Sequence, residues 1–372
     1  MRLCFISDPN SIHTRRWVGW FARHGHEVCL VADVPLQEPW PEVTIVDPSN
    51  IFYAPVIRFP VWEVWLRRFI HRWRPDILHA HRVNSAGWMG ALSGFHPFVV
   101  TAWGSDLNDL DLQPRLSRPL AGLVVRSADL ITASSKDLLH QAHLLGAKMD
   151  RCHRIQWGVD LKYFFPGNSP ELRQQLDIGE GPVIISPRAI DLIYNIHILL
   201  VAMPAVLRQF PEAKLVLRDY NTNQSYKARL MNQIADLGIE HAIRWLGRIS
   251  PWEANAAVYR MADIAVSIPF SEGMAVSVWE ALACGLPVIA SDLPSLREWI
   301  IPGENGLLVP VGDAEALGQA IVRLLGDIDM QNRFGERGVE LARQNADHQA
   351  EMIKMEQLYQ NLMPNKHTVI AG

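Results

Sequence analysis

Short apolar runs alternate with helix-length amphipathic segments along the whole chain, and the alternation occurs in both halves. A strand that is followed by a helix before the next strand is typical of parallel sheets covered by helices. Two such blocks predict an α/β protein with two doubly wound parallel sheets. The expected strands are 3–7, 27–32, 76–80, 98–102, 129–133, 153–157, 183–186, 214–218, 243–246, 264–268, 287–290 and 306–310. The expected helices include 14–24, 117–127, 135–145, 196–209, 225–238, 251–261, 275–284 and 313–325.

The segment 158–170 is rich in Gly, Pro, Asn and Ser and falls between the two blocks. Such a cluster indicates a linker, so we predict an N-terminal domain over 1–165 and a C-terminal domain over 166–345. Residues 346–372 are expected to form a helical tail that packs back on the N-terminal domain. Proteins of this build bind ligands beyond the carboxyl ends of their strands, here in a cleft that the two domains face.

Composition excludes several classes of protein. A net charge of −4 argues against a nucleic-acid binder. Four cysteines without a C-x-x-C pair indicate reduced thiols, and the absence of an H-x-x-x-H pattern predicts no catalytic metal. No apolar run reaches the roughly 18 residues of a membrane-spanning helix, and the N-terminus lacks a signal-peptide pattern. We therefore expect a cytoplasmic protein.

Two carboxylates mark the strongest candidate site. Glu272 and Glu280 are separated by seven residues, and Glu280 is the only charge between Met274 and Cys284. Glu272 falls between an expected strand and an expected helix, whose first amides suit a pyrophosphate or a sugar hydroxyl. Glu280 follows about 12 Å along the helix axis, at ~1.5 Å per residue, which fits a ribose diol. Alternatively, Glu272 caps the helix and Glu280 pairs with a distant arginine.

The sequence around these carboxylates resembles glycosyltransferase family 4, which comprises retaining enzymes of the GT-B fold. The resemblance lies in the Glu-x7-Glu segment and its continuation Ala-Leu-Ala-Cys-Gly-Leu-Pro-Val-Ile-Ala-Ser-Asp over 281–292. Weaker matches occur at 25–28, 76–81, 158–166, 245–247, 303–310 and 312–313. The resemblance implies two Rossmann-like domains, of which 1–165 binds the acceptor and 166–345 binds a nucleotide-sugar donor.

The resemblance also implies roles for single residues. Glu280 would bind the donor ribose, and Glu272 would contact the transferred sugar. Arg188 would neutralise the diphosphate, where charge grows as the leaving group departs. Sugar and phosphate oxygens would be held by the amides of Gly273, Met274, Ala275 and Val276.

The chain departs from the family pattern at three places. Ile193-Tyr194-Asn195-Ile196 stands where a Lys-Gly pair is common, so Asn195, Tyr194 or Arg218 could take the place of the lysine. The segment 218–221 replaces a glycine-rich turn. Trp103 stands where the family often has a histidine near the sugar and the acceptor. The candidates for catalysis beside Glu272 are therefore Asp106 and His13, whereas His81 and Trp103 itself are candidates for contacts with the acceptor.

The loop after the first expected strand predicts an acceptor contact. It lacks the G-x-G-x-x-G fingerprint, which argues against NAD. Its side chains Ser11, His13, Thr14 and Arg16 suit an anionic or hydroxylated acceptor. The alternative is a plain helix start with solvated arginines.

Residues 62–74 place apolar side chains at helical spacing and arginines elsewhere. This pattern favours a helix that packs on the sheet. The alternative is a peripheral helix that contacts anionic lipid at the inner face of the membrane, which would suit a lipid-linked acceptor.

The resemblance implies a transferase of the hexosyltransferase type that retains the anomeric configuration, and the absence of a metal-ligand pattern predicts that the enzyme is metal-independent. It would move a sugar from a nucleotide-diphosphate sugar to a hydroxyl of a glycan, a lipid-linked molecule or a small molecule, by a front-face route and without a cofactor. Such activity would serve polysaccharide or glycolipid biosynthesis. An epimerase or phosphorylase on the same fold, or a catalytically silent sugar-nucleotide-binding subunit, remains as an alternative.

Overall fold

The computed structural model describes residues 1–48 and 55–363, which form two compact units. Unit 1 comprises Met1–Trp157 with Ala350–Gly372, and unit 2 comprises Gly158–Gln349. The sequence placed the corresponding boundaries at 165/166 and 345/346. The linker residues 158–165 and residues 346–349 therefore belong to unit 2.

Unit 1 contains a parallel sheet with the strand order β3-β2-β1-β4-β5-β6-β7. Because helices cover both faces, its strands are continuous apolar runs rather than alternating ones. β1, for example, has five consecutive buried residues. The strands are β1 (Arg2–Ser7), β2 (Glu27–Ala32), β3 (Thr44–Val46), β4 (Ile77–His81), β5 (Phe98–Ala102), β6 (Leu130–Ala133) and β7 (Cys152–Arg154).

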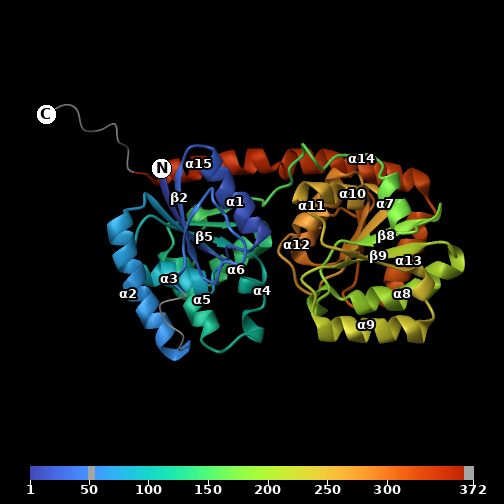
Figure 1. The fold of residues 1–372 in the computed structure, drawn as a ribbon, viewed down its shortest axis with the longest axis horizontal. Helices are drawn as coiled ribbons and strands as arrows, with labels where there is room; N and C mark the ends of the chain where they lie inside the picture. The colour runs from blue at the N-terminus through green and yellow to red at the C-terminus, as the bar shows by residue number, and fades with distance from the viewer. Residues whose placement is uncertain (49–54, 364–372) are drawn as a thin grey trace. The chain divides into compact units, whose positions relative to one another are not determined.

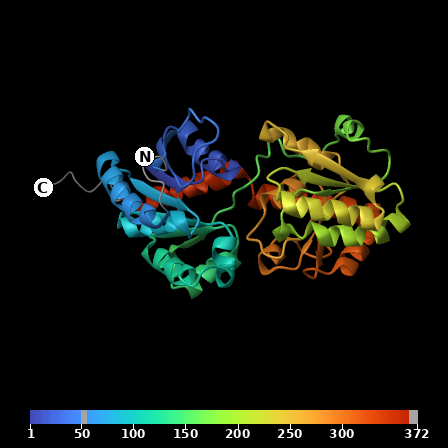
Figure 2. The ribbon, with the colours of Figure 1, turned by 60° about the horizontal axis from the view of Figure 1, so that its bottom comes forward.

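The helices of unit 1 lie on the two faces of this sheet (Figures 1 and 2). One core contains the sheet residues Leu78 and Ala80 together with side chains of α2, α3, α5 and α6. On the other face, Phe5 and His79 contact residues of α1 and α15. The helices are α1 (Ile12–Arg23), α2 (Pro55–Trp73), α3 (Ser85–Ser93), α4 (Ser105–Asn108), α5 (Ser117–Ser127), α6 (Lys136–Leu144) and α15 (His348–Leu362), with the 3-10 turns η2 (Leu110–Leu112) and η3 (Met149–Arg151).

The C-terminal helix α15 is held on unit 1 by buried polar contacts. The hydroxyl of Tyr359 shares a hydrogen bond of 2.5 Å with Nδ1 of His79. Nε2 of His79 is 2.7 Å from the hydroxyl of Thr101, which is 2.6 Å from that of Thr132. Burial lowers the pKa of His79 well below its usual value, so the imidazole is neutral and can accept from Tyr359 while donating to Thr101. These hydrogen bonds join α15 to β4, β5 and β6.

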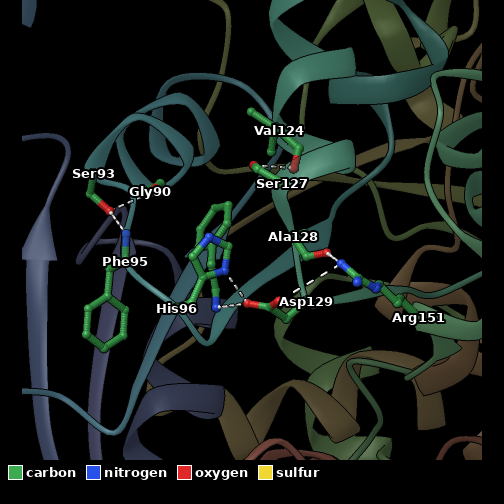
Figure 3. Close-up of polar contacts among 10 residues, drawn as sticks. Gly90, Ser93, Phe95, His96, Val124, Ser127, Ala128, Asp129 and Arg151 are labelled. Atoms are coloured by element: carbon green, nitrogen blue, oxygen red, sulfur yellow. Dashed lines mark hydrogen bonds and ion pairs between the residues drawn. The ribbon is translucent and has the colours of Figure 1, made fainter.

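The amino ends of β5 and β6 are tied together at Asp129 (Figure 3). The carboxylate of Asp129 accepts from the backbone N–H of Phe98 at 2.8 Å and lies 2.6 Å from Nδ1 of His96. Arg151 donates to the carbonyl of Ala128 at 3.1 Å. These contacts lie at the amino ends of the strands. The candidate site residues of unit 1 lie at the opposite, carboxyl ends.

Unit 2 contains a second parallel sheet with the strand order β10-β9-β8-β11-β12-β13. Its strands are β8 (Val183–Ser186), β9 (Lys214–Asp219), β10 (Ile243–Gly247), β11 (Ile264–Ser267), β12 (Val288–Ser291) and β13 (Gly306–Val309). The order reverses between β8 and β11. Side chains after these two strands therefore meet at a topological switch point, where sheets of this kind bind ligands.

The longer helices of unit 2 also divide between two faces (Figure 1). Side chains of α8, α9 and α13 form one core with the sheet, and α11 packs on α14. Side-chain caps begin several of them: Asn223, Asp313 and Asp327 each accept from an amide of the first turn. The helices are α7 (Pro170–Gln175), α8 (Ile196–Gln209), α9 (Gln224–Leu237), α10 (Ala256–Arg260), α11 (Val276–Ala283), α12 (Pro294–Arg297), α13 (Ala314–Leu325) and α14 (Ile328–Asn345), with the 3-10 turns η4 (Leu192–Tyr194), η5 (Glu240–Ala242) and η6 (Trp252–Asn255).

Candidate functional site

The centre of the candidate site in unit 2 is an ion pair between Arg188 and Glu272. Arg188 follows β8, and its Nη2 is 2.5 Å from Oε2 of Glu272, which follows β11. Its Nη1 donates to the hydroxyl of Ser277 in α11 at 3.1 Å. The structure thus brings together two residues that the sequence predicted to act on the diphosphate and the sugar. Ser277 was not among the predicted site residues.

The environment of Arg188 keeps its guanidinium charged. The side chain is buried, which disfavours the charge, but Glu272 and Tyr194 outweigh this effect and raise the pKa of Arg188 above its usual value. The guanidinium lies 4.1 Å from the centroid of the Tyr194 ring. A charged group fixed on three sides is suited to binding an anion in a set geometry.

The tip of α11 lies beside this ion pair. The helix begins at Val276, with Ala275 as its N-cap. The carboxylate of Glu272 also accepts from the N–H of Gly273 at 3.1 Å, and the hydroxyl of Ser295 donates to the carbonyl of Glu272 at 2.7 Å. The side chains of Met274, Ala275 and Val276 are buried, so the segment offers ligands its backbone rather than its side chains. Amides of a first helical turn lack intrahelical acceptors and favour anionic or hydroxyl oxygens.

Glu280 lies within α11 and is only 7% exposed. Its Oε2 accepts from the hydroxyl of Tyr259 at 2.5 Å. Burial and the charge of Glu280 raise the pKa of Tyr259 well above its usual value, so the phenol remains a donor. The sequence offered no sign that Tyr259, on α10, would hold this carboxylate.

Asn195 has a structural role that its sequence position did not reveal. It adopts the left-handed conformation with φ 53°, at the junction of η4 and α8. Its Nδ2 donates to the carbonyl of Ile268 at 3.1 Å, and the N–H of Phe270 donates to the carbonyl of Ile193 at 3.1 Å. These bonds join the segment before α8 to the segment after β11. A contact of Asn195 with a donor phosphate stays a prediction.

In unit 1, three predicted residues gather in an aromatic cluster at the carboxyl ends of β4 and β5. His13 lies 6.1 Å from Trp103, and His81 lies 6.0 Å from Trp103, between ring centroids. Trp157 contacts all three rings at 4.8–5.6 Å. His81 is fully buried, and burial together with Arg82 lowers its pKa to about 3. A neutral, enclosed His81 would reach a substrate only after Trp103 or its neighbours moved.

Asp106 organises the backbone of this region. Its two carboxylate oxygens accept from the N–H groups of Val83, Trp103 and Gly104 at 2.7, 2.9 and 2.8 Å. Burial raises the pKa of Asp106, and these three hydrogen bonds oppose the rise. The carboxylate joins the ends of β4 and β5. Its role in catalysis stays a prediction.

The first loop contains both enclosed and accessible side chains. The hydroxyl of Thr14 is buried and lies 2.8 Å from that of Ser7. Ser11 is the N-cap residue of α1 and, like Arg16, is partly exposed. Thr14 is therefore enclosed and stabilises the start of α1. The other residues predicted to contact the acceptor, Ser11, His13 and Arg16, are partly exposed.

Residues 62–74 belong to α2 and its C-terminal end. Trp62, Leu66 and Ile70 are buried in the core of unit 1, as the packing interpretation predicted. The remaining surface is basic, with Arg67, Arg68, Arg72 and Arg74 exposed. No helix within 1–48 and 55–363 is long and apolar enough to cross a bilayer. Contact of α2 with lipid stays a prediction.

Solved structures with the same fold support the two-domain architecture. Sucrose-phosphate synthase from Thermosynechococcus elongatus matches with a TM-score of 0.82 at 21% identity, over 97% of this chain and 99% of that one. HepE from Anabaena, solved with UDP-glucose, matches with a TM-score of 0.81 at 18% identity, over 97% and 100% of the two chains. The protein therefore has the GT-B fold.

Sequence comparison identifies the family. The model of glycosyl transferases group 1 matches residues 168–340, and that of glycosyl transferase 4-like proteins matches residues 2–135. The chain therefore belongs to the family 4 glycosyltransferases, as the resemblance predicted. A curated relative, D-inositol 3-phosphate glycosyltransferase of Nocardia farcinica, is 29% identical over 279 residues, which make up 71% of this chain and 62% of that protein. The match thus spans less than two thirds of that relative.

Proposed function

We propose that this protein transfers a sugar from a nucleoside-diphosphate sugar to a hydroxyl acceptor, with retention of the anomeric configuration. The observation that supports this most is the cluster at the tip of α11, in which the buried Arg188 binds the half-buried side chains of Glu272 and Ser277. It combines a fixed cation, a carboxylate and the first amides of α11 at the switch point of one sheet. Those groups match the needs of a diphosphate joined to a polyhydroxy ring.

Arg188 stabilises the departing nucleoside diphosphate. Two of its nitrogens are used by Glu272 and Ser277, but a guanidinium has five N–H donors, and the others can bind phosphate oxygens. Negative charge grows on the diphosphate as the glycosidic bond breaks, so a preorganised cation there lowers the barrier. Glu272 orients the guanidinium and accepts from sugar hydroxyls with its remaining lone pairs.

Glu280 binds the ribose hydroxyls of the donor. Its carboxylate is fixed by the Tyr259 hydroxyl and is nearly enclosed. An ionised carboxylate accepts hydrogen bonds only, which suits a diol that donates two. Burial strengthens such bonds because competing water is excluded.

Retention follows from a front-face route in this proposal. The acceptor hydroxyl attacks the anomeric carbon on the side from which the diphosphate leaves, and a phosphate oxygen of the leaving group takes its proton. The protein supplies position and charge, with no covalent sugar intermediate, metal or cofactor. The acceptor is a hydroxyl on a glycan, a lipid-linked molecule or a small molecule. The UDP and UDP-glucose complexes of HepE make UDP compounds the first donors to test.

A donor panel tests the proposal. Thermal unfolding is measured with UDP-, GDP-, ADP- and dTDP-sugars, because a ligand that binds only the native state raises the melting temperature. The best donor is then incubated with candidate acceptors, and the anomeric configuration of the product is read by NMR. An inverted product would refute retention. Altered donor sugar without acceptor would indicate an epimerase, a requirement for inorganic phosphate would indicate a phosphorylase, and binding without turnover of any acceptor would indicate a silent subunit.

A further inference from the structure

Arg218 is a buried, charged side chain of unit 2. It lies in β9, one residue before the strand ends, and is 5% exposed. Its Nε is enclosed and has no hydrogen-bond partner within the described residues. No acidic side chain in that part of the chain forms an ion pair with it. Since arginine cannot lose its charge by deprotonation, an anion from outside the chain would relieve a costly burial.

The guanidinium is nevertheless held in one orientation. Nη2 donates to Oδ1 of Asn255 at 2.9 Å, while Nδ2 of Asn255 donates to the carbonyl of Trp252 at 2.8 Å. The second bond fixes the amide so that its oxygen faces Arg218. The ring of Tyr220 lies 4.9 Å from the guanidinium. The group is thus positioned by neutral partners and keeps its full charge.

Arg218 and Arg188 lie at the same end of neighbouring strands. Ser186 pairs with Leu217 in the sheet, so Arg188 is two residues and Arg218 one residue beyond that pair. Tyr220 connects the two positions, because its hydroxyl donates to the carbonyl of Pro187 at 3.5 Å. The two arginines differ in their ion pairs: Arg188 is paired with Glu272, whereas Arg218 forms no ion pair with any of residues 1–48 and 55–363.

We propose that Arg218 binds the anionic diphosphate of the donor as a second guanidinium beside Arg188. This role rests on the proposed function. With Arg188 paired to Glu272, Arg218 supplies a second positive charge for the diphosphate that no ion pair within the described residues engages. The second positive charge that binds the diphosphate thus comes from Arg218 in β9, where the family pattern has a glycine-rich turn.

Binding of a nucleoside, its monophosphate and its diphosphate to Arg218→Gln tests this assignment. Uridine, UMP and UDP are titrated calorimetrically, or the corresponding compounds of the base that the donor panel selects. We expect the variant to bind the diphosphate at least ten-fold more weakly than wild type and the nucleoside within two-fold. Arg218→Lys, which keeps the charge and loses the planar fork, should fall between the two.

Two controls separate this role from a structural one. Arg229→Gln removes an exposed arginine of the same unit and should leave all three affinities unchanged. Asn255→Ala removes the hydrogen bond to Arg218 without removing charge, so it should weaken the diphosphate less than Arg218→Gln does. If Arg218→Gln does not fold, Arg218→Lys provides the comparison.

The outcomes distinguish the two proposals. A variant that binds diphosphate as tightly as wild type, or that loses nucleoside and diphosphate affinity equally, overturns the role of Arg218 alone. If wild type binds no nucleoside diphosphate, the proposed function falls and this inference falls with it.

Discussion

Replacing Glu280 by Gln isolates the negative charge that we assign to the ribose. The amide keeps the size of the side chain and an oxygen that can still accept from Tyr259. A hydrogen bond to a charged group contributes about 1.5–3 kcal/mol, and one to a neutral group contributes about 0.5–1.5 kcal/mol. Each hydrogen bond to a ribose hydroxyl therefore loses about 1–1.5 kcal/mol, and two lose roughly 2–3 kcal/mol together, which weakens binding by about 30- to 150-fold.

The assay is calorimetric titration of the best nucleoside diphosphate and its 2′-deoxy analogue into both proteins. The two losses should be non-additive, because the 2′-deoxy analogue removes one of the two hydrogen bonds that Glu280→Gln weakens. The melting temperature of the ligand-free variant serves as the control for folding. Equal affinity of wild type and Glu280→Gln, or additive losses in the cycle, would refute the assignment of Glu280 to the ribose.

Three further predictions concern unit 1. Tyr359→Phe should destabilise the protein by about 1–3 kcal/mol in urea unfolding, because His79 loses a buried hydrogen-bond partner; an unchanged midpoint would show that this bond does not anchor α15. The pKa of His81 is about 3 in the folded state and about 6.5 when unfolded, so the unfolded state takes up the proton first. The free energy of unfolding should fall as the pH drops below about 6.5, by roughly 2 kcal/mol at pH 5 for each such histidine. His81→Phe should make the free energy of unfolding less dependent on pH in this range. Parallel pH profiles of the two proteins would contradict the reasoning. If α2 contacts lipid, wild type should sediment with anionic vesicles and a triple alanine variant should not, whereas equal sedimentation would exclude the surface formed by Arg67, Arg68 and Arg72.

The sequence predicted the sheets well because parallel strands buried on both faces appear as apolar runs. The runs 27–32 and 98–102 correspond to β2 and β5 without a shift. The expected strand 153–157 is wrong in its second half, since β7 ends at Arg154. β3 was missed because a three-residue strand leaves too little periodicity, and α3 because its apolar residues lack a polar face.

The candidate site was predictable in part. Arg188, Glu272 and Glu280 came from the resemblance and from their positions at a strand end and in a helix, and the structure joins the first two directly. Tyr259 and Asn255 come from distant segments, and their contacts depend on packing that no local pattern encodes. The enclosure of His81 and Thr14 could not be predicted for the same reason, because a polar residue in a loop sequence does not reveal what covers it.

A crystal structure of the protein with its preferred nucleoside diphosphate tests the central claim most directly. We predict phosphate oxygens within hydrogen-bond distance of the Arg188 guanidinium and the first amides of α11, and ribose hydroxyls on the carboxylate of Glu280. Nucleotide density elsewhere, with Arg188 still bound only to Glu272 and Ser277, would contradict the account.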